Sequence, residues 1–265
     1  MRAGPSHLFL GWAVATLALA PSPWPSEAQQ PIVHHLAPPA PCEGVSCSSH
    51  GQCVSEDAQA YCFCDEGYRA EELRCVRAPA SRARAAPPAS VDGTHIVETA
   101  LAEHGHTLAE VGAMRVLPPG PLSQWVSGTL WCSDFVSWVY RAAGVPFTGG
   151  YGDGGGWHLT SNTTIRAWYQ RHDAWIDRSA PEWSSFRPRP GDYVRISTSR
   201  WGHSGIVRYV EGGTLHTIEG NADGHVITTH YGGYRAHERI DGFGLTTMAA
   251  PRMAALRAHR DAFTE

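Results

Sequence analysis

One cysteine of this chain stands apart from the other six, and its surroundings predict a reactive thiol. Cys132 lies in the fragment Gly-Thr-Leu-Trp-Cys-Ser-Asp-Phe-Val-Ser-Trp-Val, far along the chain from the other cysteines. The pattern predicts a helix of about 14 residues, capped by Thr129 and ended by Gly144, with Cys132 in its first turn. A helix N-terminus favours the thiolate, which is the nucleophilic form of the side chain. A buried, inert cysteine is the alternative.

A thiolate nucleophile needs a base that handles its proton and a group that orients the base. The segment after Arg187 contains side chains of both types, namely His203 and Glu219, followed closely by Asn221. His203 and Glu219 stand on two predicted strands that a Gly-Gly pair separates, which is typical of a hairpin. The two strands must therefore place these side chains on the same face.

The register of this hairpin decides whether the two side chains meet. A two-residue turn at residues 212–213 would leave Glu219 facing away from His203. A three-residue loop that adds Glu211 puts both side chains on one face, with Gly205 opposite Glu219. We predict the three-residue loop, and a bulge elsewhere in the hairpin would serve equally.

The other six cysteines lie close together and predict a small, covalently stapled module. They are Cys42, Cys47, Cys53, Cys62, Cys64 and Cys75. A segment this short cannot bury enough apolar surface to fold without cross-links, and spacing alone leaves fifteen connectivities. A zinc knuckle is the alternative, which an oxidising compartment disfavours.

The spacing of these cysteines, with a Cys-x-Cys followed by Gly67-Tyr68, resembles an EGF-like domain over residues 42–75. The resemblance implies the pairs Cys42–Cys53, Cys47–Cys62 and Cys64–Cys75. Calcium-binding modules of this kind carry acidic residues just before the first cysteine. Because Ala-Pro-Pro-Ala-Pro stands there, we expect no calcium site.

The first residues of the chain predict export. Residues 1–28 contain an apolar run from Leu8 to Ala20 and a small-x-small cleavage pattern at Ser26 and Ala28, as in a signal peptide. The run is too short for a membrane span, and an uncleaved anchor is the alternative. We expect a protein that is secreted or lies in the periplasm or cell envelope, with no membrane span after cleavage. The remaining irregular segments are predicted linkers at 29–41 and 76–91, and a C-terminal tail at 249–265.

The charge and histidine content exclude other function classes. The formal net charge is −4, and the 21 basic residues are all Arg and are interspersed with acidic ones. This pattern argues against nucleic acid as a partner and against a polybasic membrane anchor. The absence of Lys removes lysine-based acyl chemistry and phosphate loops. Fifteen histidines suggest a zinc peptidase, but the sequence has no His-Glu-x-x-His.

Four fragments in order resemble the CHAP amidohydrolase/peptidase family, within the broader NlpC/P60 papain-like group. They read Trp-Cys-Ser-Asp-Phe-Val-Ser-Trp-Val, Pro-Arg-Pro-Gly-Asp-Tyr-Val, Gly-His-Ser-Gly-Ile-Val and Ile-Glu-Gly-Asn. The resemblance spans residues 92–248. It implies an α+β fold in which N-terminal helices that carry the cysteine pack on an antiparallel sheet that carries the histidine. It also implies that the substrate is bacterial peptidoglycan or its stem peptides, cleaved at an amide bond.

The resemblance assigns roles to four residues. It implies that Cys132 is the nucleophile, His203 the base, Glu219 the group that orients His203, and Asn221 a second polar member of the site. We expect no cofactor and no metal, because the stretch before the cysteine lacks the acidic cluster of calcium-binding members. We also expect the protein to be a monomer. The expected substrate contacts are two tryptophans beside the predicted site, Trp131 and Trp201.

Two other functions are compatible with the sequence. The domain could grip a peptide without cutting it, as a wall-binding or adhesion module, or it could transfer the acyl group to an amine. The Gly-rich stretch from Thr148 to Thr160 is compatible with a mobile loop along a cleft and also with a plain connection.

Overall fold

The computed structural model describes residues 40–56, 58–79, 93–115, 119–126, 128–198 and 202–246. The predicted signal peptide, Trp201, the C-terminal tail and most of both linkers lie outside these residues. Within the described segments, no helix has the length and apolar character needed to cross a bilayer.

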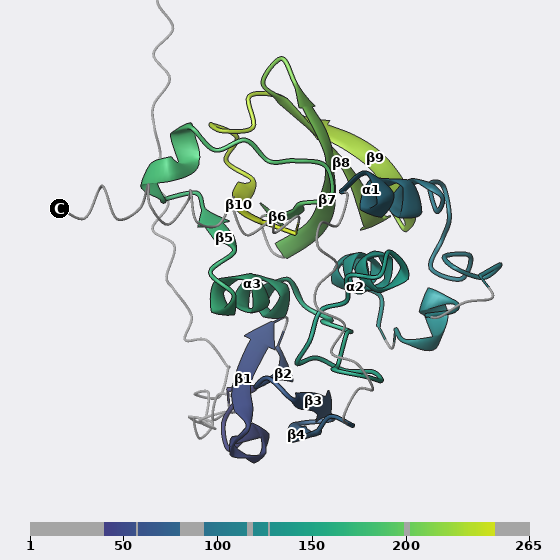
Figure 1. Cartoon of the computed structure of the whole chain (residues 1–265), viewed down its shortest axis with the longest axis vertical. Helices are drawn as coiled ribbons and strands as arrows, with labels where there is room; N and C mark the ends of the chain where they lie inside the picture. The colour runs from purple at the N-terminus through teal and green to yellow at the C-terminus, as the bar shows by residue number, and fades with distance from the viewer. Residues whose placement is uncertain are drawn as a thin grey trace, which may run out of the picture. The chain divides into compact units, whose positions relative to one another are not determined.

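The described residues from 93 to 246 form a sheet domain in which helices contact a six-stranded antiparallel sheet (Figure 1). Each neighbouring pair of strands is antiparallel. This is the α+β architecture that the sequence predicts. In spatial order the strands are β5 (Trp175–Asp177), β10 (Ile240–Gly244), β6 (Tyr193–Ser197), β7 (Gly202–Glu211), β8 (Thr214–Ala222) and β9 (His225–Tyr231). The helices are α1 (Gly93–Leu101), α2 (Cys132–Ala142) and α3 (Asn162–Arg171), with short 3-10 turns η2 (Leu122–Gln124) and η3 (Pro181–Ser184).

The helix α2 begins at Cys132 itself, which differs from the prediction. The N-cap is Trp131, so the predicted cap at Thr129 is wrong. The reason lies in the loop before the helix, where the side-chain amide of Asn221 donates to the carbonyl of Thr129 at 3.0 Å. This contact ties the loop to the end of β8, and the chain turns into the helix only after it. Cys132 is therefore the first helical residue.

The end of α2 agrees with the prediction. Gly144 has a φ of 82°, and the N–H of Val145 donates to the carbonyl of Tyr140 at 2.8 Å. These are the features of a Schellman stop, for which a glycine in the left-handed region is preferred. The residues of α2 from Cys132 to Tyr140 are all buried. The helix is therefore a core element held rigidly against β7 and β8.

The turn between β7 and β8 is tighter than the sequence predicted. It has two residues, Gly212 and Gly213, with φ of 54° and 80°, and Glu211 pairs with Thr214. The predicted three-residue loop is therefore wrong. Two successive residues of positive φ match the twist of the flanking strands, and glycines adopt them without strain.

A bulge in the same hairpin restores the predicted pairing at the site. The register shifts between Val207 and Tyr209, so that beyond this point Gly205 lies opposite Glu219. This is the alternative that the sequence left open, and it is confirmed. The extra residue of the hairpin sits in the strand rather than in the turn.

A glycine in β8 allows α2 to approach the sheet closely. A Cβ added to Gly220 would lie 2.4 Å from the Cβ of Phe135 on α2. We expect Gly220→Ala to lower the free energy of unfolding by about 1–3 kcal/mol, because the helix must move away from the strand. Thermal melting checks this, with Gly232→Ala as the control, since a Cβ there meets nothing within 4 Å. Equal melting temperatures for the two variants would contradict the close approach.

The cysteine-rich segment folds as two small hairpins, which we call the disulfide module (residues 42–77). Strand β1 pairs with β2 and β3 with β4. The structure contains the three disulfides that the EGF-like resemblance implies, Cys42–Cys53, Cys47–Cys62 and Cys64–Cys75. Its elements are η1 (Cys47–Ser49), β1 (Gly51–Glu56), β2 (Gln59–Cys64), β3 (Tyr68–Glu71) and β4 (Arg74–Arg77), the last of which extends into the predicted 76–91 linker.

The disulfide module packs on the sheet domain through its backbone. The N–H of Cys64 donates to the carbonyl of Gly149 at 2.8 Å, and that of Ala70 donates to Gly150 at 2.7 Å. A Cβ at Gly149 would lie 2.5 Å from the carbonyl oxygen of Cys64. The Gly-rich stretch from Thr148 to Thr160 is therefore a docking segment, in which the lack of side chains lets two backbones meet.

Side chains of the first hairpin complete this contact. Phe63 is fully buried in the same apolar core as the helices of the sheet domain, and Val54 packs against that core. The guanidinium of Arg171, on α3, lies 3.7 Å from the centre of the Phe63 ring. The module is thus joined to the sheet domain by apolar burial as well as by hydrogen bonds.

Candidate active site

A cleft of about 520 Å³ lies beside the N-terminal end of α2. Three of the four residues predicted for the catalytic site line it, namely Cys132, His203 and Asn221. A cleft of this size is in the range that binds small ligands or short segments of a polymer. Other lining residues were not predicted from the sequence, and they include Trp125, Asp134 and Asn162 from the sheet domain and Glu56, Gln59 and Tyr61 from the disulfide module.

His203 lies between the thiol and a carboxylate. Its Nε2 lies 2.9 Å from an Oε2 of Glu219, and the thiol of Cys132 lies near enough to the imidazole to raise its pKa. Because Glu219 engages Nε2, the other ring nitrogen is the one left for the thiol. Glu219 is 3% exposed and Cys132 is 7% exposed, so both contacts are screened little by solvent. The structure therefore brings Cys132, His203 and Glu219 into one chain of contacts.

The carboxylate of Glu219 is held by two further donors. The hydroxyl of Thr217 donates to Oε1 at 2.6 Å, and the hydroxyl of Tyr231 donates to the same oxygen at 3.0 Å. Burial and the charge of Glu219 raise the pKa of Tyr231, which keeps its hydroxyl protonated as a donor. These contacts fix the carboxylate so that its second oxygen faces His203. Neither donor was predicted, although both lie on strands next to the predicted site.

The surroundings of His203 favour its protonated form. Burial lowers the pKa of the imidazole, but the hydrogen bonds and negative charges of Cys132 and Glu219 outweigh it and raise the pKa to about 10. An imidazolium beside a thiolate is a preformed ion pair of nucleophile and acid. The arrangement can therefore attack a carbonyl and then protonate a leaving amine.

A second buried pair lies two residues further along α2 than Cys132. An oxygen of Asp134 lies 2.7 Å from Nε2 of His158, and both residues are almost fully buried. Burial raises the pKa of Asp134, and the hydrogen bond and charge of His158 oppose that shift. The pair joins the first turn of α2 to the docking segment. Nothing in the spacing of the two residues indicated that they meet.

A buried polar network links the chain neighbours of Cys132 and His203. Asn162, the first residue of α3, accepts through Oδ1 from the hydroxyls of Ser133 and Ser204, the first at 3.2 Å. Ser133 follows Cys132 in the chain, and Ser204 follows His203. Asn162 therefore ties α2 to β7 beside Cys132 and His203. No prediction from the sequence covered this corner, where the side chain of Ser161 caps α3.

The remaining predicted site residues have different surroundings. Asn221 lines the cleft and holds the loop before α2, with a φ of 56°. Trp131 is 3% exposed and packs edge-on against Phe135, so it belongs to the core and not to the cleft lining. Trp201 lies outside the described residues. Among the described residues, the tryptophan that lines the cleft is Trp125.

Comparison with solved structures gives matches of low similarity. Two are titled "The crystal structure of Ly7917" and "The crystal structure of Ly7917 with the hydrolyzing product of MDP". They share 19% and 17% sequence identity with this chain, with TM-scores of 0.35 and 0.33. The matches cover 58% and 57% of this chain, and the chain spans 62% of the length of each of those structures. No curated protein sequence matches the chain significantly.

Comparison with protein families gives a match at the site itself. The family described as "CHAP domain" matches residues 124–221. The matched segment contains Cys132, His203, Glu219 and Asn221, together with the whole of α2 and β7 and all of β8 except its last residue. Residues 124–221 are therefore similar to a CHAP domain, as the sequence fragments indicated.

Proposed function

We propose that this protein is a cysteine-dependent hydrolase that cleaves amide bonds of bacterial peptidoglycan. The observation that carries the proposal is the contact chain from Cys132 through His203 to Glu219, which lies beside a cleft and within the CHAP-matched segment. A module that only binds peptide has no use for a thiol paired with an imidazolium. The contact chain thus favours hydrolysis over the adhesion alternative.

The mechanism follows from the positions of these groups. The thiolate of Cys132 attacks the scissile carbonyl, and the sulfur–carbon bond forms as the carbonyl electrons move to oxygen. His203 gives its proton to the leaving nitrogen, and the carbon–nitrogen bond breaks to leave an acyl-enzyme. Neutral His203 then takes a proton from water, whose oxygen attacks the acyl carbon, and the thiolate leaves. Glu219 holds the ring and stabilises its charge throughout.

The start of α2 supplies part of the stabilisation of the oxyanion. As the first helical residue, Cys132 has an N–H that no carbonyl within the helix can reach. This N–H and the positive end of the helix dipole lie where negative charge develops on the carbonyl oxygen. The beginning of the helix at Cys132, and not two residues earlier, therefore serves the reaction directly.

The wider assignment belongs to the same proposal. We take the sheet domain, over residues 92–248, as papain-like and the disulfide module as EGF-like, and we take the protein to act outside the cytoplasm as a monomer. The three disulfides support an oxidising location, because such bonds persist there. The fully engaged Cys132–His203–Glu219 site supports a reaction without a metal or cofactor.

Digestion of purified peptidoglycan tests the function. The proposal predicts fragments in which one amide bond has gained one water, seen by mass spectrometry as a new amino group and a new carboxylate. The fragments also identify whether the cut lies between the sugar and the peptide or within the stem peptide. Fragments cut only at glycosidic bonds, or no fragments at all, would contradict the proposal.

A further inference from the structure

The disulfide module reaches into the cleft that contains Cys132. Three residues of its first hairpin line the cleft, namely Glu56, Gln59 and Tyr61. In the β1–β2 pairing Val54 lies opposite Tyr61, and Glu56 lies opposite Gln59. Alternate residues of a strand share a face, so these four side chains all project from one face of the hairpin. That face is directed at the sheet domain.

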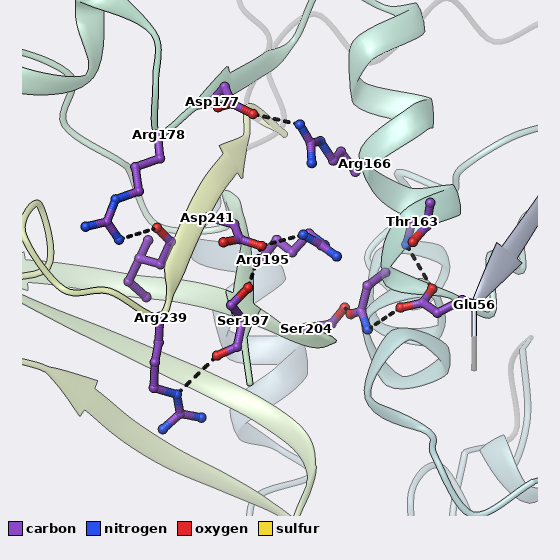
Figure 2. Close-up of polar contacts among 12 residues, drawn as sticks. Glu56, Thr163, Arg166, Asp177, Arg178, Arg195, Ser197, Ser204, Arg239 and Asp241 are labelled. Atoms are coloured by element: carbon purple, nitrogen blue, oxygen red, sulfur yellow. Dashed lines mark hydrogen bonds and ion pairs between the residues drawn. The ribbon is translucent and has the colours of Figure 1, made fainter. Parts of the chain in front are cut away.

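The carboxylate of Glu56 fixes this hairpin at the edge of the cleft (Figure 2). One oxygen accepts from the side-chain amide of Asn162 at 3.0 Å, and the other accepts from the backbone N–H of Thr163 at 3.0 Å. Both donors lie in the first turn of α3, where the helix dipole favours a negative charge. Asn162 is the residue that also bridges Ser133 and Ser204. The module therefore contacts the same network that holds the nucleophile and the base.

The apolar residues of this face prevent the hairpin from swinging away. Phe63 is buried in the shared core, and Val54 packs against it. Moving the hairpin off the sheet domain would expose the Phe63 ring to water, which is unfavourable for a large apolar side chain. The wall that Gln59 and Tyr61 present to the cleft is thus held in place.

The two side chains of this wall have a defined chemistry. The hydroxyl of Tyr61 donates to the side-chain carbonyl of Gln59 at 2.7 Å, which orients the amide. With its oxygen engaged in this way, the amide of Gln59 presents N–H donors. N–H donors beside an aromatic ring match an extended peptide, which offers carbonyl acceptors and small apolar side chains.

We propose that the β1–β2 hairpin of the disulfide module is a substrate-binding wall of the active site, where Gln59 and Tyr61 hold the peptide part of the substrate. The inference rests on the proposed function, because it takes the cleft to receive the scissile amide. A peptide crossing Cys132 must pass along this wall, since the wall and the thiol line the same cleft. The module is then part of the enzyme's specificity and not a separate binding domain.

The test measures kcat and KM of the full-length protein for two soluble substrates, a free stem peptide and the same peptide joined to its disaccharide. Tyr61→Ala and Gln59→Ala are expected to raise KM about tenfold for both substrates, with kcat nearly unchanged. Tyr61→Phe keeps the ring but removes the hydroxyl that orients Gln59, so its KM is expected to fall between those of the wild type and Tyr61→Ala. Gln52→Ala is the matched control, because Gln52 is exposed on the same hairpin and does not line the cleft.

The outcomes separate this inference from the proposed function. Wild-type protein that cleaves neither substrate contradicts the proposed function, and unchanged KM values in active variants contradict only the wall. A rise in KM confined to the substrate with the disaccharide means that the wall binds sugar, which overturns the peptide assignment. The concentration of stem peptide that protects Cys132 from iodoacetamide measures binding separately from kcat. The protecting concentration should rise about tenfold in Tyr61→Ala, and an unchanged value would overturn the inference.

Discussion

Replacement of Cys132 by alanine is expected to lower kcat/KM for amide cleavage by roughly 10⁴-fold or more. Alanine cannot form the acyl-enzyme, and His203 then has no thiolate partner. The initial rate at which new amino groups appear from purified peptidoglycan measures the effect.

The fold of this variant should remain intact. The substitution replaces the thiol group on Cβ by a hydrogen atom. Alanine is well tolerated at the start of a helix, where this residue stands. Thermal melting and a count of the three disulfides serve as controls. A folded Cys132→Ala protein that retains a tenth or more of the wild-type rate would mean that the chemistry lies elsewhere.

Replacement of Glu219 by alanine is expected to lower kcat by roughly 100-fold or more, with a smaller change in KM. Without the carboxylate, the ring of His203 loses the contact that fixes its orientation, and Thr217 and Tyr231 lose their acceptor. Glu219→Gln keeps one oxygen acceptor, removes the charge and replaces the second oxygen by an NH2 donor. Its kcat should therefore fall between those of the wild type and the alanine variant, as initial rates on a soluble stem peptide would measure.

The dependence of activity on pH gives a second test of the Glu219 substitutions. Cys132 and Glu219 hold the pKa of His203 at about 10, so wild-type activity should decline only as the pH rises through that value. Removing the charge of Glu219 removes one of the causes that raise this pKa, so the alkaline decline should move to lower pH in both variants. Glu211→Gln, at the exposed end of β7, is the control. An alkaline limb at the same pH in all four proteins would show that Glu219 does not act on His203.

The sequence predicted which residues come together at the proposed site better than it predicted the structure around them. The lone cysteine, the histidine and the glutamate were found because each type is needed for one chemical role and because their fragments resemble a family. The stop of the helix at Gly144 followed from a local pattern and is confirmed. Residues that are neighbours in the sequence suffice to predict an element whose ends depend only on the local backbone conformation.

The start of α2 was predicted wrongly because a distant contact decides it. Thr129 is a good N-cap by type, but its carbonyl is taken by Asn221 from another strand. The hairpin turn was predicted wrongly for a related reason. The Gly-Gly pair satisfies a two-residue turn, and the extra residue moves to a bulge that only the paired strands reveal.

The docking of the disulfide module could not be read from the sequence. The glycines of the docking segment are needed because another backbone approaches them, as at Gly149. Glu56 has no distinctive neighbours in the chain, and its partners, Asn162 and Thr163, are far away in sequence. Long-range packing of this kind leaves no periodic pattern, so the sequence left the role of the module open.

The rate at which iodoacetamide alkylates Cys132 tests the central claim most directly. The other six cysteines are in disulfides, so Cys132 is the one free thiol among the seven. The proposed ion pair predicts fast alkylation of the wild-type protein at neutral pH. It also predicts labelling at least about tenfold slower in His203→Ala, rising only as the pH approaches the ordinary range for a thiol. Equal rates in the two proteins at neutral pH would contradict activation of Cys132 by His203.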